Sequence, residues 1–266
     1  MLHGSIYPKS LARLAAYTAA LAVSCAALPR ASAQQPDSLN LQQELLRLGE
    51  AATELEHTLP SFTCQESALS QQLKNGKVLQ GVQFVATLRA QRGADGKLDE
   101  SITITSVNGQ PFTNGHFHLP VFVSGGFDRM MRYFAPEEQA CYRYSLAPGR
   151  INFQALPGPD TPTCKDSGTV GFALLDAAGN ATRVERRVDQ AMAKPRKEAI
   201  YAADDIAPIE LNGHSYRLAH HLYAEMPAGK EVGAFTADYA ACKLFTATVT
   251  ISPATPAHDT PAAPPE

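Results

Sequence analysis

The chain has 266 residues, of which 23 are basic and 26 acidic, giving a net charge of −3 at neutral pH. This mildly acidic balance disfavours broad nucleic-acid binding, which is driven by lysine and arginine side chains that neutralise phosphates. The length allows one large domain or two small ones, and no internal linker rich in proline, glycine or serine divides the chain.

The first 33 residues have the features of an export signal. They hold three basic residues and no acidic one, then an apolar run over residues 14–28, and they end in Ala31-Ser32-Ala33. A charged start, an apolar centre and a small-x-small ending, in this order, predict cleavage after Ala33. A membrane anchor would need about 20 apolar residues, and this run is shorter. Because three basic residues leave with the signal, the processed chain has a net charge of −6.

Cys25 offers a second interpretation of the same segment. It follows Ala22-Val23-Ser24, which satisfies a loose lipoprotein-box rule, so the protein could instead be anchored through a lipid on Cys25. Cleavage after Ala33 explains the small residues beyond Cys25, which lipidation would leave without a purpose. We therefore expect a periplasmic or secreted protein with no transmembrane segment after signal removal, and a lipoprotein anchored through Cys25 as the alternative.

Four cysteines remain in the processed chain: Cys64, Cys141, Cys164 and Cys242. An even number in an exported chain predicts two disulfides, for which the sequence permits three pairings. We favour Cys141–Cys164, which closes a local loop, and Cys64–Cys242, which joins the start of the domain to its end. Metal ligation is the alternative, but no two of these cysteines stand at C-x-x-C spacing.

A long helix is expected after the signal. Asp37 and Ser38 offer capping side chains, and Pro60 ends the pattern. Apolar residues recur between them at steps of three and four, at Leu41, Leu45, Leu48, Ala52, Leu55 and Leu59. This stripe predicts an amphipathic helix that is buried against something larger than itself.

The chain then alternates apolar and polar residues, as strands of a half-exposed antiparallel sheet do. A first hairpin is predicted from residues 82–90 and 102–105, and Asn108-Gly109 predicts a further tight turn. Two more strand pairs follow, the first turning at Pro148-Gly149 and the second at residues 178–180.

Further segments bring the expected number of strands to about eight to ten. Among the strands, a short helix is predicted over residues 127–134. Residues 214–226 and 243–252 predict the closing strands, the latter with Phe245, Ala247, Val249 and Ile251 on one face.

These elements predict an α+β fold, in which a strongly curved antiparallel sheet, like half a barrel, wraps around the one long N-terminal amphipathic helix. The expected organisation is a signal peptide at 1–33, a single domain at 34–251 and a disordered tail rich in proline and alanine at 252–266. Such a sheet would leave a concave apolar surface on which a ligand could lie.

The order of elements resembles that of the lipoprotein-carrier fold, a half-open β-barrel lidded by helices, and of related envelope-stress sensor domains. The stretch FTCQESALSQQLKNGKVLQGVQFVATLRA stands where those families have their first strands. The stretch GTVGFALLDAAGNATRVERR is similar to one of their hairpins, here with Gly171, Asp176 and Gly179 around the turn. The resemblance covers about Ser38 to Ile251 and implies a fold, but it assigns a role to no residue.

No catalytic signature is present. The sequence has no G-x-S-x-G, H-E-x-x-H, P-loop or G-x-G-x-x-G motif. His116 and His118 would face the same side of an extended segment and could share a metal ion. However, no other histidine or carboxylate stands at a sequence spacing typical of a metal site. We therefore expect no cofactor, no metal and no enzyme, with a metal-dependent enzyme as the least favoured alternative.

Three other groups of polar residues need no functional interpretation. In the pair His220-His221 we expect one side chain inside and one in water, and for Asp204-Asp205 a solvated loop or helix end. The stretch from Arg183 to Lys197 has six basic residues, which indicate either a patch for lipid headgroups or acidic partners, or a solvated hairpin and loop, and we favour the latter.

Aromatic residues gather between His118 and Cys141. Core packing would explain most of them, but the rim of a ligand pocket would come from Phe117, Phe122, Phe127, Tyr133 and Phe134. The leading hypothesis is an exported, non-enzymatic protein that holds an apolar or lipid-like ligand, or an envelope protein partner, in the concave face. The alternative is a structural or interaction protein with a filled core and no ligand.

Overall fold

A computed structural model describes residues 36–113, 115, 117–158, 164, 168–188, 200–228 and 231–245. The expected signal peptide, Cys25 and the tail at 252–266 lie outside these residues, and so does His116.

Helix α1 (Pro36–Thr58) is the predicted amphipathic helix. Its stripe is buried most deeply toward the C-terminal end, where Leu48, Ala52 and Leu55 are almost fully covered, as is Leu59 just beyond the helix. Three carbonyl groups at this end, those of Leu55, Glu56 and Leu59, accept hydrogen bonds from the guanidinium of Arg92. The last carbonyls of a helix lack partners within the helix, so this cation completes the C-terminus.

Eleven strands form one antiparallel sheet in the described part of the chain. Their bounds are β1 Phe62–Lys74, β2 Lys77–Arg92, β3 Leu98–Val107, β4 Gln110–Pro111, β5 Tyr142–Ala147, β6 Arg150–Ala155, β7 Thr169–Leu175, β8 Ala181–Val188, β9 Tyr201–Leu211, β10 His214–Ala228 and β11 Glu231–Leu244. The prediction of an open antiparallel sheet with one long helix is confirmed, although the expected number of strands was too low.

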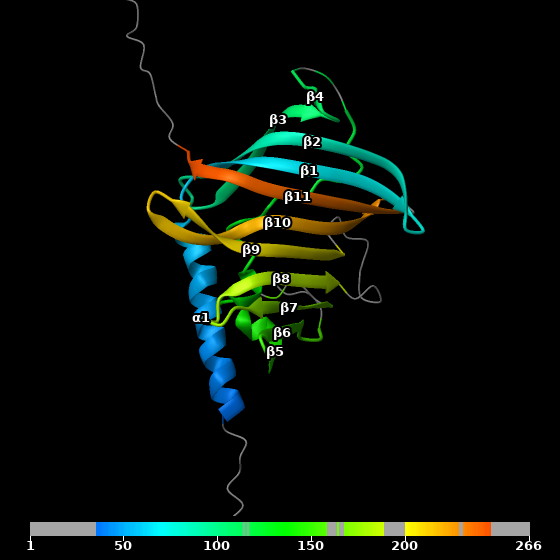
Figure 1. The fold of residues 1–266 in the computed structure, drawn as a ribbon. Coiled ribbons are helices and arrows are strands. Elements are labelled where there is room, and N and C mark those ends of the chain that lie inside the picture. Colours follow the sequence, from blue (N-terminus) through cyan, green and yellow to red (C-terminus); the bar gives the residue numbers. More distant parts are fainter. Residues whose placement is uncertain are drawn as a thin grey trace, which may run out of the picture. The chain divides into compact units, whose positions relative to one another are not determined.

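The sheet has the order β4-β3-β2-β1-β11-β10-β9-β8-β7-β6-β5 (Figure 1). Strands that are consecutive in the sequence pair with each other, except β4 and β5, and at the centre β1 pairs with β11. The sheet is not closed, because β4 and β5 are its two edges.

Three of the hairpins turn on the dipeptide Asn-Gly. The pairs at residues 75–76, 108–109 and 212–213 have φ values between 49° and 77°. Positive φ at both central positions defines the two-residue turn whose twist matches that of paired strands. Asn and Gly reach this conformation with least strain, so these dipeptides fix the registers β1–β2, β3–β4 and β9–β10.

One face of the sheet, which we call the inner face, carries the core. Its large buried side chains include Phe62, Phe84, Leu88, Ile151, Phe153 and Leu218. The chain between β4 and β5 must pass from one edge of the sheet to the other, and it does so across this face. We call residues 121–141 the strap.

The strap contains no regular helix over residues 127–134, so that prediction was wrong in length and type. Its backbone forms hydrogen bonds between residues three apart, and only Arg132–Phe134 and Gln139–Cys141 are 3-10 helices. Gly125-Gly126 before the segment and Pro136 after it limit a longer helix. Five neighbouring residues from Met130 to Ala135, apart from Arg132, are buried because the strap is covered on more than one side.

The last strand also differs from the prediction. It is β11, which ends at Leu244, whereas the expected strand covered residues 243–252. Ala247, Val249 and Ile251 lie outside the described residues. The preceding stretch EVGAFTADYAACKL is rich in small residues and was not recognised as a strand, because tertiary pairing overrides its weak preference for a strand.

Two disulfides join the pairs that the sequence analysis favoured. Cys64 of β1 is bonded to Cys242 of β11, at a sequence separation of 178. The register shifts next to Cys64, and Ala241 has a φ of 50°, so a bulge in β11 lies opposite this cysteine. Cys141, at the end of the strap, is bonded to Cys164.

Candidate functional site

A hollow of about 340 Å³ lies between the strap and strands β8–β10. We call it the inner-face pocket, and its volume is at the lower end of the range for small-molecule sites. Its apolar lining comes from both sides: Phe122, Val123, Met130, Ala202, Leu222 and Met226. A second hollow, of about 940 Å³, lies between α1 and the turns of the β5–β6 and β7–β8 hairpins, but it lacks a buried polar group without a partner.

Asp204 is the unusual residue of the inner-face pocket. It lies on β9 between Val184 of β8 and Leu222 of β10, both of which are buried. The residue as a whole is half-buried, but its Oδ1 atom is covered and has no hydrogen-bond partner among the described residues. Burial raises the pKa of this carboxyl to about 7, although the charge of Arg186 opposes the shift.

Asp204 and Asp205 do not act as a pair, and neither lies in the solvated loop or helix end that was expected. Successive side chains of a strand point to opposite faces. Asp205 therefore lies on the outer face, where its Oδ1 is 2.6 Å from Nη1 of Arg183. Asp204 alone faces the pocket, so a buried carboxyl without a partner is available to a hydrogen-bond donor of a ligand.

Arginine side chains surround the rest of the pocket. Arg129 and Arg132 come from the strap and Arg186 from β8. The guanidinium of Arg132 lies over the ring of Tyr133, 5.1 Å from its centroid. The lining thus places three guanidinium groups and one carboxyl next to apolar walls.

Two contacts fix the first part of the strap to the sheet. Ser70 Oγ donates a hydrogen bond of 2.7 Å to the carbonyl of Val121 and accepts one of 3.1 Å from its N–H. The carboxylate of Glu100 accepts hydrogen bonds from the N–H groups of Gly126 and Phe127, at 3.1 Å and 2.9 Å. The chain on the strap side of the pocket is therefore held at two points.

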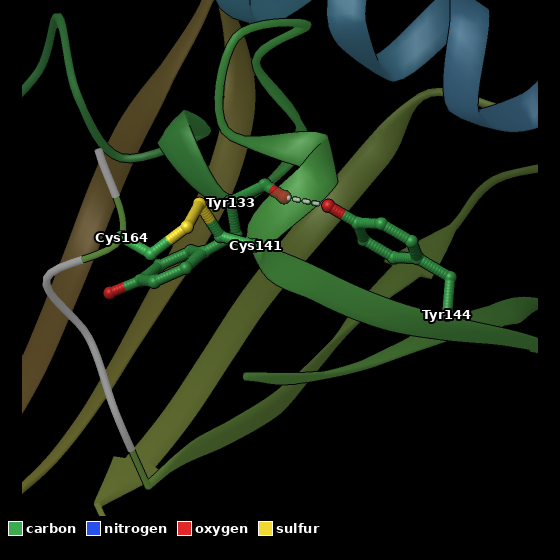
Figure 2. Close-up of a disulfide and its surroundings, with 4 residues drawn as sticks. All are labelled: Tyr133, Cys141, Tyr144 and Cys164. Atoms are coloured by element: carbon green, nitrogen blue, oxygen red, sulfur yellow. Dashed lines mark hydrogen bonds between the residues drawn. A yellow bond between two sulfur atoms is a disulfide. The ribbon is translucent and has the colours of Figure 1, made fainter. Parts of the chain in front are cut away.

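The second part of the strap is fixed by the Cys141–Cys164 disulfide and by Tyr144. Figure 2 shows the ring of Tyr133 beside this disulfide, and the Tyr144 hydroxyl donating a hydrogen bond of 2.5 Å to the backbone oxygen of Tyr133. The ring of Tyr133 stacks on that of Phe153, with 4.7 Å between centroids. The pocket wall is therefore a preformed surface.

Gly233 of β11 allows the strap to approach the sheet. A methyl group on this glycine would stand 2.0 Å from Cγ1 of Val121, closer than side chains can pack. We expect Gly233→Ala to lower the free energy of unfolding by about 1–3 kcal/mol, the usual cost of overpacking. In urea denaturation, adding Val121→Ala should recover part of this loss, because it removes the clashing atoms. Equal losses in the single and double variants would contradict this contact.

Known proteins resemble the chain only distantly. No family model matches it, and no curated protein does. Among solved structures, a LolA superfamily protein from Nitrosomonas europaea is 8% identical, with a TM-score of 0.36 over 77% of this chain and 94% of that one. A DUF1329 family protein from Desulfovibrio piger is 11% identical, with a TM-score of 0.37 over 78% and 94%.

A candidate outer-membrane lipoprotein-sorting domain from Vibrio parahaemolyticus is also 11% identical, with a TM-score of 0.34 over 78% of this chain and 94% of that one. The names of the first and third of these proteins match the lipoprotein-carrier fold that the sequence pattern resembles. At such TM-scores the likeness has no bearing on function. No helix in the described part of the chain is long and apolar enough to cross a membrane.

The aromatic residues predicted for a pocket rim are separated by the structure. Phe122 and Tyr133 line the inner-face pocket, and their contact with a ligand stays a prediction. Phe127 and Phe134 are fully buried, and Phe127 packs edge-on against Phe62 and Tyr239. Phe117 is half-buried against Phe112 and does not line the pocket.

The histidines lie away from the pocket. His118 is exposed, and the described residues contain no group of three side chains placed to hold a metal ion. His220 is exposed beside a register shift between Ala219 and His221. His221 is half-buried, with Nδ1 2.7 Å from Oδ1 of Asp238. The expectation that one histidine of the pair lies inside was wrong, because the bulge removes the strict alternation.

The sequence analysis missed the residues that give the pocket its polarity, Asp204 and Arg186. One signal was available: Ala202, Asp204 and Ile206 alternate along one face, so that a single charge interrupts an apolar row. A carboxylate on the buried face of a strand is costly unless it is paired, so this position pointed to a site that binds a polar group.

Proposed function

We propose that the protein is an exported, non-enzymatic binding protein that holds an apolar or lipid-like ligand in the inner-face pocket. One observation carries the proposal, namely a buried carboxyl oxygen of Asp204 without a partner at an apolar hollow. A buried polar atom without a partner costs about 1–3 kcal/mol, which a ligand donor would recover. The two disulfides and the signal-like N-terminus support export.

The lining chemistry favours an amphiphile with a polar end. The apolar residues would cover an alkyl or ring portion, and the Asp204 carboxyl would accept a hydrogen bond from a hydroxyl or amine. Arg129, exposed at the strap, would attract an acidic group of the same ligand. The pocket is too small for a whole diacyl lipid, so a single chain or part of one would enter.

A specific observation also favours the second function, a structural or interaction protein. Helix α1 and the strap contribute to the core on the inner face, where Leu48, Leu55, Phe127 and Phe134 belong to one core cluster. In this case an envelope protein partner would bind the outside of the domain. The two functions differ in whether the inner-face pocket takes up a ligand.

Fluorescence titration with an apolar naphthalene-sulfonate dye, together with native mass spectrometry of the protein purified from an exporting host, tests the proposal. Phe122 is 41% exposed at the pocket, and Leu174 is 36% exposed on β7, outside it. Because a carboxylate would replace an apolar wall, we expect Phe122→Asp to weaken dye binding on the order of tenfold. Leu174→Asp, the matched control, should leave it within about twofold.

A co-purified amphiphile in the wild type that is absent from Phe122→Asp would support the same conclusion. A wild-type protein that is empty in native spectra and inert toward the dye would overturn it, and would favour the filled-core alternative. Equal loss of binding in both variants would show that the dye binds elsewhere.

A further inference from the structure

The outer face of the sheet carries another hollow, of about 560 Å³, over strands β5–β9. We call it the outer-face groove. Most of its side chains alternate with buried residues of the same strands, such as Ile151 and Val184, and so point away from the core. The groove therefore opens on the opposite face of the sheet from the inner-face pocket, although Arg186 is part of both linings.

Besides Arg186, three arginines line the outer-face groove: Arg143 of β5, Arg150 of β6 and Arg187 of β8. No carboxylate in the described part of the chain forms an ion pair with any of these three. Arg143 and Arg187 are exposed, and Arg150 is half-buried with its guanidinium 5.1 Å from the ring centroid of Phe172. These cations are therefore not used to hold the fold together.

The groove lining also includes one carboxylate, that of Glu185, which is already paired. Arg183 contacts Glu185 at 3.3 Å and Asp205 at 2.6 Å, so this one cation accounts for both acidic side chains. Three guanidinium groups without a carboxylate partner remain around a concave surface. A concave surface with an excess of one sign of charge concentrates ions of the other sign.

The register gives the spacing of the three cations. Arg143 pairs with Gln154, Gln154 with Val170, and Val170 with Arg187, so the two arginines are three strands apart in one row. At about 4.8 Å per strand their Cα atoms are about 14 Å apart. Arg150 stands four residues from Gln154, about 13 Å along β6. A single small anion does not span this triangle, whereas a molecule with two or more acidic groups does.

Neutral donors lie between the arginines. The amide groups of Asn152 and Gln154 also line the groove and can donate to phosphate oxygens. The Asn152 amide already donates one hydrogen bond of 3.2 Å to Ser145 Oγ, and the Tyr201 hydroxyl is bonded to Glu185. Strands β6–β8 pair on both sides, so their backbone groups are not free to bind an extended peptide, which normally adds to a sheet edge. Guanidinium groups bind phosphate through two parallel hydrogen bonds.

We propose that the outer-face groove binds a compact phosphate ester with two or more phosphate groups. The basic stretch noted in the sequence then has a role at its β8 end, through Arg187, and the Arg150–Phe172 contact holds one guanidinium over the hollow. Binding is electrostatic in part, so it weakens as salt concentration rises.

Calorimetric titration of the purified full-length chain with inorganic triphosphate at low ionic strength tests this proposal. Arg143→Gln and Arg187→Gln should each weaken binding about three- to tenfold, because each removes one charge-assisted contact at an exposed site. The double variant should weaken it by the product of the two factors, since the residues are far apart. Arg89→Gln makes the same change of net charge at an exposed position on β2, and should change affinity less than about twofold.

Absence of triphosphate binding by the wild type would overturn the proposal, and so would an equal effect of Arg89→Gln, which would indicate net charge alone. Vesicles of phosphatidylcholine with and without phosphatidylglycerol separate a membrane surface from a soluble ligand. Sedimentation with the anionic vesicles that depends on Arg143 and Arg187, without triphosphate binding, would assign the groove to a membrane and reject a compact phosphate ester. The dye titration of Phe122→Asp reports on the inner-face pocket independently.

Discussion

Replacing Glu66 by glutamine should make the protein more stable at pH 8 by about 3 kcal/mol. Glu66 lies on the inner face of β1 opposite Tyr239 of β11, and only 1% of it is exposed. Its Oε2 atom and the Tyr239 hydroxyl have no hydrogen-bond partner among the described residues. Burial, reinforced by the charge of Glu100, raises the pKa of Glu66 from 4.5 to about 7.

The pH dependence of this effect has a definite sign. The folded state holds the proton of Glu66 more tightly than the unfolded state, so stability is greatest below about pH 4.5 and falls as the pH rises through 7. Glutamine is neutral at every pH and keeps the shape of the protonated acid. The difference between variant and wild type should therefore be near zero at pH 4.5 and reach about 3 kcal/mol at pH 8, at about 1.4 kcal/mol per pKa unit.

Urea denaturation followed by circular dichroism, from pH 4.5 to pH 8, measures this difference. Glu50→Gln, at an exposed position of α1, is the control and should change the free energy of unfolding by less than about 0.5 kcal/mol at either end. A Glu66→Gln curve parallel to the wild-type curve would show that Glu66 is not the titrating group.

The two disulfides should contribute unequally. In the chain-entropy model, a bridge stabilises the folded state by restricting the unfolded chain, and more so for a longer loop. Cys64–Cys242 encloses 178 residues and Cys141–Cys164 only 23, which corresponds to about 5 and about 3 kcal/mol. Replacing both cysteines of the long bridge by alanine should therefore lower the free energy of unfolding by about 2 kcal/mol more than the same change in the short one.

Denaturation of the two paired-alanine variants under non-reducing conditions provides the comparison. The variant without Cys141 and Cys164 should in addition bind the apolar dye less tightly, because this bridge holds the strap beside the pocket. A larger loss of stability from the short bridge would contradict the entropic account and point to packing at the strap instead.

The helix and the hairpins could be predicted because their signals are local. The leucine stripe from Leu41 to Leu59 and the Asn108-Gly109 turn each depend on residues a few positions apart, and both were recognised correctly. The disulfide pairing followed from loop lengths. These features needed no knowledge of which strands are neighbours.

The site depended on information that the sequence does not hold. Asp204 is significant only because β9 lies between β8 and β10 and the strap covers it, and this register is set by tertiary pairing. Strand β9 itself contains Asp204-Asp205 and Pro208, which disfavour strands on propensity alone. The outer-face groove likewise combines five strands, β5–β9, whose alignment cannot be read from the sequence.

The pairing of β1 with β11 sets a condition on when the molecule can fold. A chain emerges from the ribosome with its N-terminus first, and here a strand that starts at Phe62 finds its partner only once Leu244 has been made. Contacts between such distant residues form slowly, because a long loop must close before they are gained. The central seam of the sheet therefore stays open until β11 has been made, which would suit the proposed export, because the chain would still be unfolded when it is threaded through a translocation channel.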